Sequence, residues 1–144
     1  MLQPYTRIGG NLTFAPPLLA HVQTDGSFGP RKGARVAAII VAANQKHVWK
    51  DMATVTACSS TETEWASVAF GLHLAIKNGQ EAVGLENDNL SVIHGLLFPR
   101  GPLRHEYANH YRHEIQRLAT QTVWTGVRWI PRERNKADDL FHLR

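Results

Sequence analysis

Four carboxylates stand where the sequence changes from one predicted element to the next: Asp25, Glu64, Asp88 and Asp138. Two of them follow predicted strands that could be neighbours in a sheet, and two begin predicted helices that could pack beside those strand ends. Converging carboxylates repel one another, so such a cluster needs cations. Oxygen ligands without a supporting cysteine or histidine suit Mg²⁺ or Mn²⁺ rather than zinc. Phosphoryl transfer is the chemistry that this kind of site serves best.

The first two acids also have structural explanations of their own. Asp25 lies in the segment TDGS at the end of a predicted strand, and Asp-Gly is a common turn signal. Glu64 lies three residues after Thr61, which is the spacing of a capping box at the start of a helix. For either residue alone, a role in local structure is a sufficient interpretation.

The same is true of the other two acids. Asp88 follows a predicted strand and could cap the next helix. Asp138 lies three residues after Asn135, which could cap the last helix, and an acid at that position suits the helix dipole. The hypothesis of a metal site therefore depends on all four acids converging, and not on any one of them.

The sequence between the acids predicts the elements that would position them. Apolar and β-branched runs favour strands at residues 20–28, 34–43, 47–56, 82–87 and 123–130, and helical periodicity favours helices at 62–77, 89–97, 104–120 and after Asn135. Residues 1–19, broken by paired glycines and paired prolines, are predicted to be an irregular N-terminal arm before one domain at 20–144. The first three strands should form an antiparallel meander, and the later strands should pair in parallel through helical crossovers. The predicted fold class is α/β, a mixed sheet flanked by helices.

Periodicity also predicts which side chains face the core. Two helical stripes are apolar, and they comprise Trp65, Val68, Leu72 and Ile76, and Tyr107, Tyr111, Ile115 and Leu118. The strand at 47–56 offers Val48, Met52 and Val55. The four tryptophans are interpreted as core or sheet residues rather than base-stacking platforms, and they are Trp49, Trp65, Trp124 and Trp129. His110 and His113 are expected on a solvated helix face.

Composition indicates a single globular domain with a polyanionic partner. The chain has 144 residues and a formal net charge of +4. Basic side chains form two clusters that could track a phosphate backbone, Arg31, Lys32 and Arg35, and Arg128, Arg132, Arg134 and Lys136. With one cysteine, Cys58, the chain cannot form an internal disulfide framework, so a location in the reducing cytoplasm is expected. No apolar run is long enough for a membrane span, and the N-terminus does not have the pattern of a signal peptide.

Four segments resemble the four motifs of type 1 ribonuclease H, in the same order. They are TDGS with Asp25, TEWASVAFGL with Glu64, ENDNLSVIHGL with Asp88, and WIPRERNKADDL with Asp138. The resemblance covers residues 20–140 and implies a ribonuclease H-like fold with a five-stranded mixed sheet. It also implies an endonuclease that hydrolyses the RNA strand of an RNA–DNA hybrid. Attack by a metal-bound hydroxide would leave 5′-phosphate and 3′-hydroxyl ends, and the protein is expected to be a monomer.

The resemblance assigns two metal ions, Mg²⁺ or Mn²⁺, to the four acids. Asp25 would bridge both ions, Glu64 and Asp88 would complete one site, and Asp138 would support the other. The fourth acid is open to two alignments. Counting four residues from Asn135, as the family usually has it, selects Asp139. The small apolar residue before the acid and the leucine two after it select Asp138, which we prefer, because the other alignment places Asp138 in a buried apolar position.

The sequence departs from the family in three places. Ser60 and Thr61 stand where the family often has paired asparagines that contact the minor groove of the hybrid. The basic handle of some members is absent, because only FPRGPLR separates the two middle helices. The short segment PRERN replaces the histidine-bearing loop before the last acid. Contacts with the substrate are expected from Ser27, Ser60, Thr61, Arg132, Asn135 and Lys136.

Two other functions fit parts of this pattern. One is a transposase or resolvase nuclease of the same superfamily, which a strand-transfer assay would reveal. The other is a catalytically weak module that binds hybrids without cutting them. The presence of all four acids argues against the second function, and a metal titration would test it.

Overall fold

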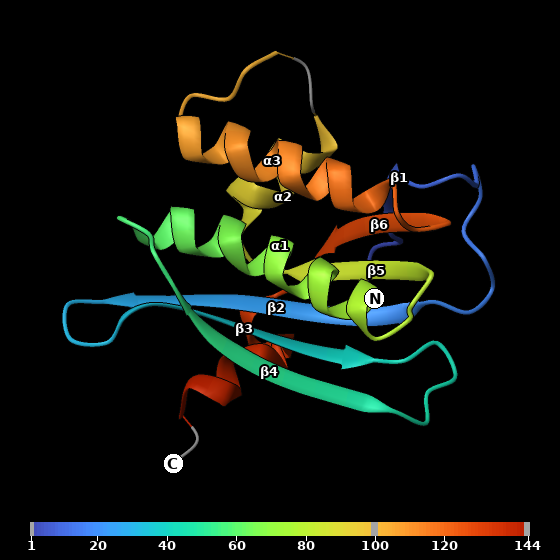
Figure 1. Cartoon of the computed structure of the whole chain (residues 1–144), viewed down its shortest axis with the longest axis horizontal. Helices are drawn as coiled ribbons and strands as arrows, with labels where there is room; N and C mark the ends of the chain where they lie inside the picture. Colours follow the sequence, from blue (N-terminus) through green and yellow to red (C-terminus); the bar gives the residue numbers. More distant parts are fainter. Residues whose placement is uncertain (1, 99–100, 143–144) are drawn as a thin grey trace.

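A computed structural model describes residues 2–98 and 101–142, and it has one sheet with helices on both faces (Figure 1). The strands are β1 (Thr6–Gly9), β2 (Ala20–Gly29), β3 (Gly33–Val41), β4 (Val48–Val55), β5 (Ala82–Asn87) and β6 (Trp124–Trp129). The α-helices are α1 (Ser60–Lys77), α2 (Leu90–Leu97) and α3 (Glu106–Ala119), and the 3₁₀-helices are η1 (Arg132–Arg134) and η2 (Lys136–His142). Helices α1 and α3 lie over one face of the sheet, and η2 lies against the other.

The sheet is mixed, which confirms the predicted fold class. Its strand order is β1-β6-β5-β2-β3-β4. Strands β2, β3 and β4 form the expected antiparallel meander, and β5 pairs in parallel with both β2 and β6. Because β2, β5 and β6 run in the same direction, their carboxyl ends meet at one edge of the sheet. The segments that carry the candidate acids begin at this edge.

The sheet has six strands where the sequence predicted five. The additional strand, β1, lies in the arm that was predicted to be irregular, and it pairs antiparallel with β6. Tyr5 anchors its start, because the ring lies so close to Gly84 that a Cβ there would meet it at 2.4 Å. With four residues, β1 is too short to show a periodicity. Its formation depends on the edge of β6, more than a hundred residues away, which local sequence does not reveal.

The main core lies between the sheet and the two long helices. Trp65, Val68 and Leu72 of α1 are buried, and so are Ile115 and Leu118 of α3, as predicted. A smaller apolar cluster on the opposite face joins η2 to β3, and it comprises Ala37, Ala137, Leu140 and Phe141 with Ile39 at its edge. Apolar side chains therefore cover both faces of the sheet, one beneath α1 and α3 and the other beneath η2.

The prediction for β4 is wrong at two of its three core positions. Val48 is 53% exposed and Met52 is 42% exposed. Both lie on the outer face of an edge strand, whereas Trp49 is partly buried and packs against the main core. Val55 is partly buried on the same side as Trp49. Residues 48, 52 and 55 mix the two faces of a strand with a period of two, so they could not all point inward.

The predicted end of α1 is confirmed. Asn78 is its C-cap and Gly79, with φ of +78°, donates its amide to the carbonyl of Ile76 at 3.0 Å. The segment FPRGPLR, which separates the two middle helices, includes residues 99 and 100, and these lie outside the described part of the chain. Among the described helices, none combines the length and the apolar character that crossing a membrane requires.

Two glycines allow α1 to lie unusually close to β2. A Cβ on Gly71 of α1 would meet Thr24 Cγ2 at 2.4 Å and Val22 Cγ1 at 3.0 Å. A Cβ on Gly26 of β2 would meet the backbone of Thr63 at 2.9 Å. The first turn of α1 therefore rests directly on the backbone of β2, at the place where Asp25 lies.

Replacing Gly71 with alanine should destabilise the protein, although alanine favours a helix by about 1 kcal/mol. The added methyl group has no space beside Thr24, and overpacking of this kind costs about 1–3 kcal/mol. We expect a lower urea midpoint with an unchanged m-value. Gly29→Ala is the control, because a Cβ at that position would meet no heavy atom within 4 Å. A midpoint for Gly71→Ala equal to that of the wild type would contradict the close packing of α1 on β2.

Candidate metal centre

Asp25 and Asp88 are brought together by the parallel pairing of β2 with β5. The last pair in this register is Gln23 with Glu86, so each aspartate lies two residues beyond it. Strand β2 continues along β3 as far as Gly29, and Asp25 is paired there with Ala37. Asp25 is therefore inside a strand and not in a turn, which corrects the position that the Asp-Gly signal suggested.

Glu64 reaches the same place from α1, one residue beyond the first turn of the helix. The N-cap of this helix is Ser59, whose side chain accepts a hydrogen bond from the Glu62 amide at 3.1 Å. The Glu62 carboxylate in turn accepts a hydrogen bond from the amide of Cys58 at 2.9 Å. The capping box predicted for Thr61 and Glu64 is therefore wrong, because other residues cap the helix. The Glu64 carboxylate is left to accept a short hydrogen bond from the amide of Gly26.

Asp88 is also free of the capping role that its position suggested. The N-cap of α2 is the next residue, Asn89, whose side chain accepts from the Val92 amide at 3.2 Å. The buried side chain of Asn87 fixes the turn before it, because it donates to the Thr24 carbonyl at 3.1 Å and accepts from the Asn89 amide at 2.8 Å. The Asp88 carboxylate therefore projects from a turn whose backbone is held on both sides.

One carboxylate oxygen from each of Asp25, Glu64 and Asp88 lies within 4.8 Å of the other two. Asp25 and Glu64 are each only 8% exposed. The three acids line an open cavity of about 560 Å³, together with Gly26, Ser27, Ser60, Asn89, Arg132, Asp138 and His142. Three carboxylate oxygens at this spacing, in a cavity open to solvent, could hold a divalent cation.

Burial and mutual repulsion shift the titration of these acids in one direction. Burial, followed by the negative charge of Asp88, raises the pKa of Asp25 to about 7. Burial, followed by the charges of Asp25 and Asp88, raises the pKa of Glu64 to about 9. Burial also raises the pKa of Asp88, although the nearby Arg132 guanidinium opposes the shift. Without a bound cation, the protonated forms of these carboxyl groups are therefore favoured, as expected where carboxylates lie close together with no positive charge to offset their repulsion.

Asp138 and Asp139 occupy different places. Asp138 is partly buried, lines the cavity and lies close enough to Asp25 to affect its pKa. Asp139 is exposed and lines a separate depression beside η1. Asp138 is outside the group of three whose oxygens lie within 4.8 Å of one another. The geometry therefore places Asp138, and not its neighbour, in the wall of the cavity next to Asp25.

Only some of the residues that were predicted to contact a substrate line the cavity that holds the acids. Ser27, Ser60 and Arg132 line the cavity with the acids. Thr61 does not, because it lines a neighbouring cavity of about 270 Å³ beside Trp65. Asn135 is buried and holds the backbone, donating to the Thr24 carbonyl at 2.8 Å.

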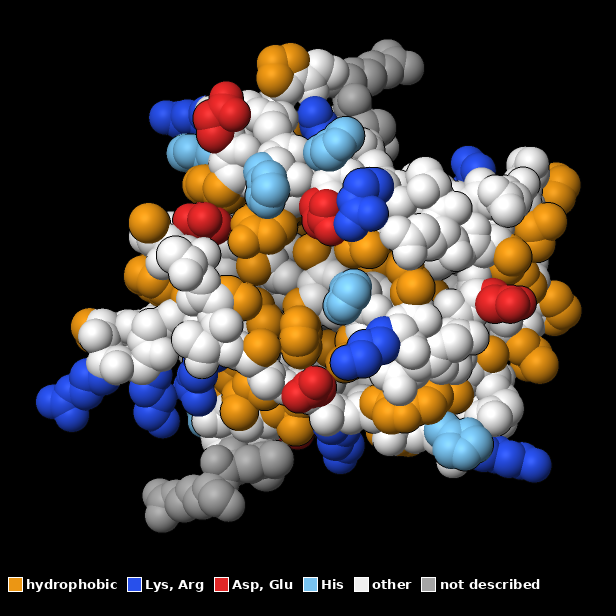
Figure 2. All heavy atoms as spheres, viewed as in Figure 1, with side chains coloured by type: hydrophobic (Ala, Val, Ile, Leu, Met, Phe, Trp, Pro, Cys, Tyr) orange, Lys and Arg blue, Asp and Glu red, His pale blue; other side chains and the backbone are white. Residues whose placement is uncertain are grey.

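The basic clusters are also divided by the structure. Lys136 is exposed and lies beside Arg132 in the depression next to the cavity. Arg31 and Lys32 are exposed at the β2–β3 turn, where basic side chains project in Figure 2. Arg128 does not belong to the predicted basic patch, because it forms an ion pair with the buried Glu86. Arg35 lies over the ring of Phe141, with its guanidinium carbon 5.1 Å from the ring centre.

One residue at the cavity was missed by the sequence reasoning. His142 lines the cavity, and its Nε2 lies 3.5 Å from Oδ2 of Asp138. The spacing of four residues between the two was the available signal. The other histidine and tryptophan predictions hold: His110 and His113 are exposed on α3. Trp65 and Trp124 are buried, and the Trp129 indole donates to the Asp88 carbonyl at 3.0 Å.

Solved structures share this fold. Ribonuclease H1 of the halophilic archaeon Halobacterium salinarum NRC-1 has a TM-score of 0.74 and 20% identity, over 84% of this chain and 92% of that one. The N-terminal RNase H domain of a Mycobacterium tuberculosis protein, solved as a fusion with maltose-binding protein, has a TM-score of 0.74 and 23% identity, over 85% and 90%. LC11-RNase H1, isolated from compost by a metagenomic approach and solved with an RNA/DNA hybrid, has a TM-score of 0.70 and 16% identity, over 84% and 92%. The fold is ribonuclease H-like.

Residues 23–141 match the reverse transcriptase-like family, and the chain belongs to that family. The comparison with curated proteins gave no match. The matched residues include all four acids of the cavity wall, from Asp25 in β2 to Asp138 in η2.

Removing divalent cations should make stability fall as the pH rises. Since the pKa values of Asp25 and Glu64 are raised in the folded protein, the folded state binds more protons than the unfolded chain between about pH 4 and about pH 9. The free energy of unfolding in EDTA should therefore decrease across this range, and added Mn²⁺ should restore it at the alkaline end. Urea unfolding at pH 5 and pH 8 measures both effects.

Glu64→Gln should flatten this pH dependence, because it removes one titrating group and the charge that Asp25 faces. Asp51→Asn, at an exposed position on β4, is the matched control and should retain the wild-type dependence. Equal slopes for the two variants would contradict the electrostatic coupling of the cluster.

Proposed function

We propose that this chain is a metal-dependent endonuclease that hydrolyses the RNA strand of RNA–DNA hybrids. The observation that carries the proposal is the convergence of Asp25, Glu64 and Asp88 in one open cavity, with Asp138 on its wall. The ribonuclease H-like fold supports it, and one of the similar structures is a ribonuclease H1 in complex with an RNA/DNA hybrid. A silent binding module would have no use for three converging acids, two of them buried, whose repulsion costs stability.

The donor set fits Mg²⁺ or Mn²⁺. All ligand atoms are carboxylate oxygens, and the cysteine of the chain, Cys58, is exposed before α1 and does not line the cavity. Asp25, Glu64 and Asp88 would hold one ion, and Asp25 with Asp138 would hold a second. Bound ions of this kind activate water as a nucleophile and stabilise the departing oxygen of a phosphodiester.

The protein's own contribution is to fix the carboxylates before a substrate arrives. The Gly26 amide orients Glu64, and the buried side chain of Asn135 lies close enough to Asp88 to stabilise its charged form. Arg132 lies beside Asp88 and could bind a phosphate of the backbone. Such pre-arranged groups lower the cost of reorganisation in the transition state.

Recognition of RNA requires a group that senses the 2′-hydroxyl. Ser60 and Ser27 have hydroxyls in the cavity and are proposed for this role. Thr61 is proposed for a different contact, because it faces the neighbouring cavity that Trp65, Arg104 and Tyr107 also line. The 2′-hydroxyl is recognised and does not attack, so the products should carry 5′-phosphate and 3′-hydroxyl ends.

Replacing one acid of the cavity should abolish cleavage without unfolding the protein. Asp25→Asn removes the central ligand, and Asp138→Asn removes the neighbouring acid in the cavity wall. Both should lower hybrid cleavage by at least about 100-fold, the loss typical of a group that acts in the transition state. Relief of repulsion should leave the thermal stability of metal-free Asp25→Asn level with or above that of the wild type.

Asp139→Asn is the matched control, because this acid is adjacent in sequence but exposed outside the cavity. It should cleave a labelled hybrid in Mn²⁺ at the wild-type rate. Ligation of the wild-type products, with and without phosphatase treatment, tests the ends. Cyclic 2′,3′-phosphate ends would overturn the proposed mechanism, and normal cleavage by Asp25→Asn would overturn the proposed site.

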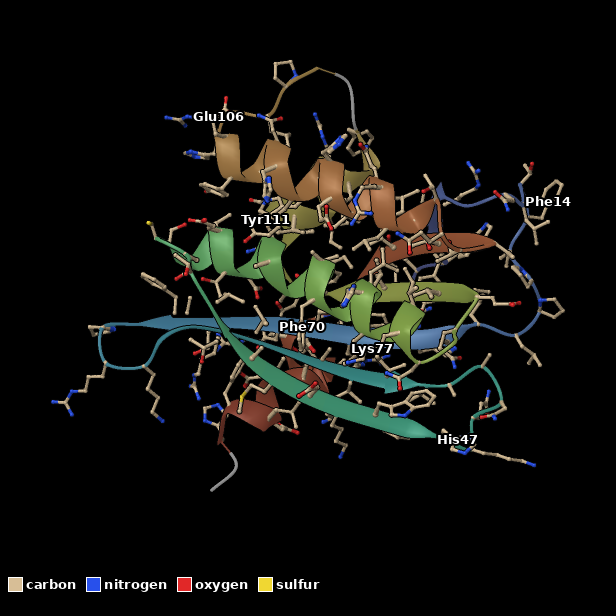
Figure 3. All side chains as sticks on the ribbon, viewed as in Figure 1. Phe14, His47, Phe70, Lys77, Glu106 and Tyr111 are labelled. Atoms are coloured by element: carbon tan, nitrogen blue, oxygen red, sulfur yellow. The ribbon has the colours of Figure 1, made fainter. Side chains whose placement is uncertain are left out.

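Affinity for the hybrid should fall with salt, in part through Arg132 and Lys136. Each phosphate contact contributes about 0.9 to the slope of log affinity against log salt concentration. Alanine at either position should reduce the slope by about that amount, measured in the Asp25→Asn background so that the hybrid stays intact. Lys77→Ala is the control, because Lys77 ends α1 at the opposite end from Glu64 (Figure 3). Unchanged slopes for both test variants would exclude this patch from the binding surface.

A further inference from the structure

The side chain of Gln23 connects the sheet to the segment that carries Asp138. Its Oε1 accepts a hydrogen bond from the Lys136 amide at 2.8 Å. Its Nε2 donates to the Arg134 carbonyl at 3.1 Å and to Glu86 Oε1 at 3.1 Å. One amide group therefore binds the backbone on both sides of Asn135, where η1 ends and η2 is about to begin.

The orientation of this amide is determined by its partners. A carboxylate and a carbonyl only accept hydrogen bonds, and a backbone amide only donates. Rotating the Gln23 amide by half a turn would place an oxygen against Glu86 and Arg134, and a nitrogen against the Lys136 amide. All three contacts would then be unfavourable. These hydrogen bonds therefore define where residues 134–136 lie, and they define that Oε1 of Gln23 faces the Lys136 amide while Nε2 faces the Arg134 carbonyl.

Glu86 is itself held in place, so it can orient Gln23. It is 4% exposed, and its other oxygen, Oε2, accepts from Arg128 Nε at 2.7 Å and from the Tyr5 hydroxyl at 3.0 Å. The Arg128 guanidinium lies over the Tyr5 ring, 4.0 Å from its centre. The Tyr5 hydroxyl also contacts His21 Nδ1 at 2.6 Å. Glu86 is fully engaged and does not belong to the metal cluster.

The segment fixed by Gln23 leads directly into Asp138. The contacts of η2 itself with the sheet are mostly apolar: Ala137, Leu140 and Phe141 pack against Ala37, and Arg35 lies over the Phe141 ring. Apolar contacts are non-directional, so they hold η2 against the sheet without defining its position along it. The two backbone hydrogen bonds of Gln23 supply that definition, and the hydrogen bond from Asn135 to the Thr24 carbonyl adds a third polar contact between them.

We propose that Gln23 is a positioning residue for Asp138: by fastening residues 134–136 to the β2–β5 edge, it sets the place of the fourth carboxylate relative to the other three. The inference rests on the proposed function, because it gives Asp138 a role at the metal centre. Gln23 touches neither metal nor substrate. It acts through the backbone of η2, in the way that groups behind a metal ligand tune its affinity by about 10–100-fold.

The test is Gln23→Leu, which keeps the size of the side chain and removes all three hydrogen bonds. Mn²⁺ binding to the free protein is measured by calorimetry, without substrate. The variant should bind Mn²⁺ at least about tenfold more weakly, and the Lys136 amide should lose its protection from hydrogen exchange. Gln80→Leu is the matched control. Gln80 also braces the backbone through its side chain, accepting from the Ala43 amide at 3.0 Å at the far end of the sheet, so it should alter stability alone.

A double-mutant cycle separates positioning from general weakening of the fold. In the Asp138→Asn background, Gln23→Leu should cause no further loss of Mn²⁺ affinity, because the group that it positions is already gone. Additive losses, or an affinity that falls equally in Gln80→Leu, would overturn the inference. If Gln23→Leu does not fold, Gln23→Asn replaces it, because the shorter amide cannot reach Arg134 and Lys136 together, and the same outcomes apply. If Asp138→Asn alone leaves Mn²⁺ affinity unchanged, the assignment of Asp138 in the proposed function fails, irrespective of Gln23.

Discussion

Three carboxylates, two of them buried and the third partly buried, lie within 4.8 Å of one another, and the structure is arranged around their mutual repulsion. Charges so close in a partly buried setting interact far more strongly than charges on the surface. The raised pKa values of Asp25 and Glu64 express the cost. The packing of α1 on β2 holds the carboxylates together against this repulsion. That packing is possible because Gly71 and Gly26 have no side chains, and it places the Glu64 carboxylate where it accepts a hydrogen bond from the Gly26 amide. A cation would turn the same arrangement from repulsive to attractive.

The carboxyl edge of the sheet is held by side-chain amides. Past the last pair of β2 with β5, the Thr24 carbonyl has no strand partner in β5, and a buried carbonyl without a partner is costly. Asn87 and Asn135 both donate to it, at 3.1 Å and 2.8 Å. Asn87 ends β5 and Asn135 lies between η1 and η2, so one carbonyl joins the turn before Asp88 to the start of η2. The rigidity of the edge therefore comes from polar contacts, whereas the core beneath is apolar.

The sequence predicted most of the elements and the convergence of the four acids at one cavity, because both depend on patterns that are local or ordered along the chain. Periodicity identified α1, α3 and five strands, and the four motifs identified Asp25, Glu64, Asp88 and Asp138. Helix caps were predicted less well. Ser59, Ser60 and Thr61 can each begin a helix, so local sequence does not reveal that Ser59 is the N-cap and that Glu64 is free.

Other features depend on partners that are distant in sequence. Strand β1 forms because β6 has a free edge, and Arg128 leaves the predicted phosphate patch because Glu86, 42 residues earlier, is buried beside it. The exposure of Val48 follows from the place of β4 at the edge of the sheet. None of these can be read from a window of sequence, since each depends on which elements become neighbours.

An acidic cavity is an unfavourable place for a polyanion, so under the proposed function the binding of cations and the binding of nucleic acid should depend on each other. Arg132 and Lys136 lie beside the carboxylates on one side, and Arg31 and Lys32 lie at the β2–β3 turn. A phosphate backbone held by these groups would bring further negative charge to Asp25 and Asp88. Cation affinity would then rise, and by reciprocity a bound cation would raise the affinity for the phosphate. The affinity of the free protein for a metal ion would consequently understate its affinity in a complex with nucleic acid, because the phosphate itself completes the electrostatic balance of the site.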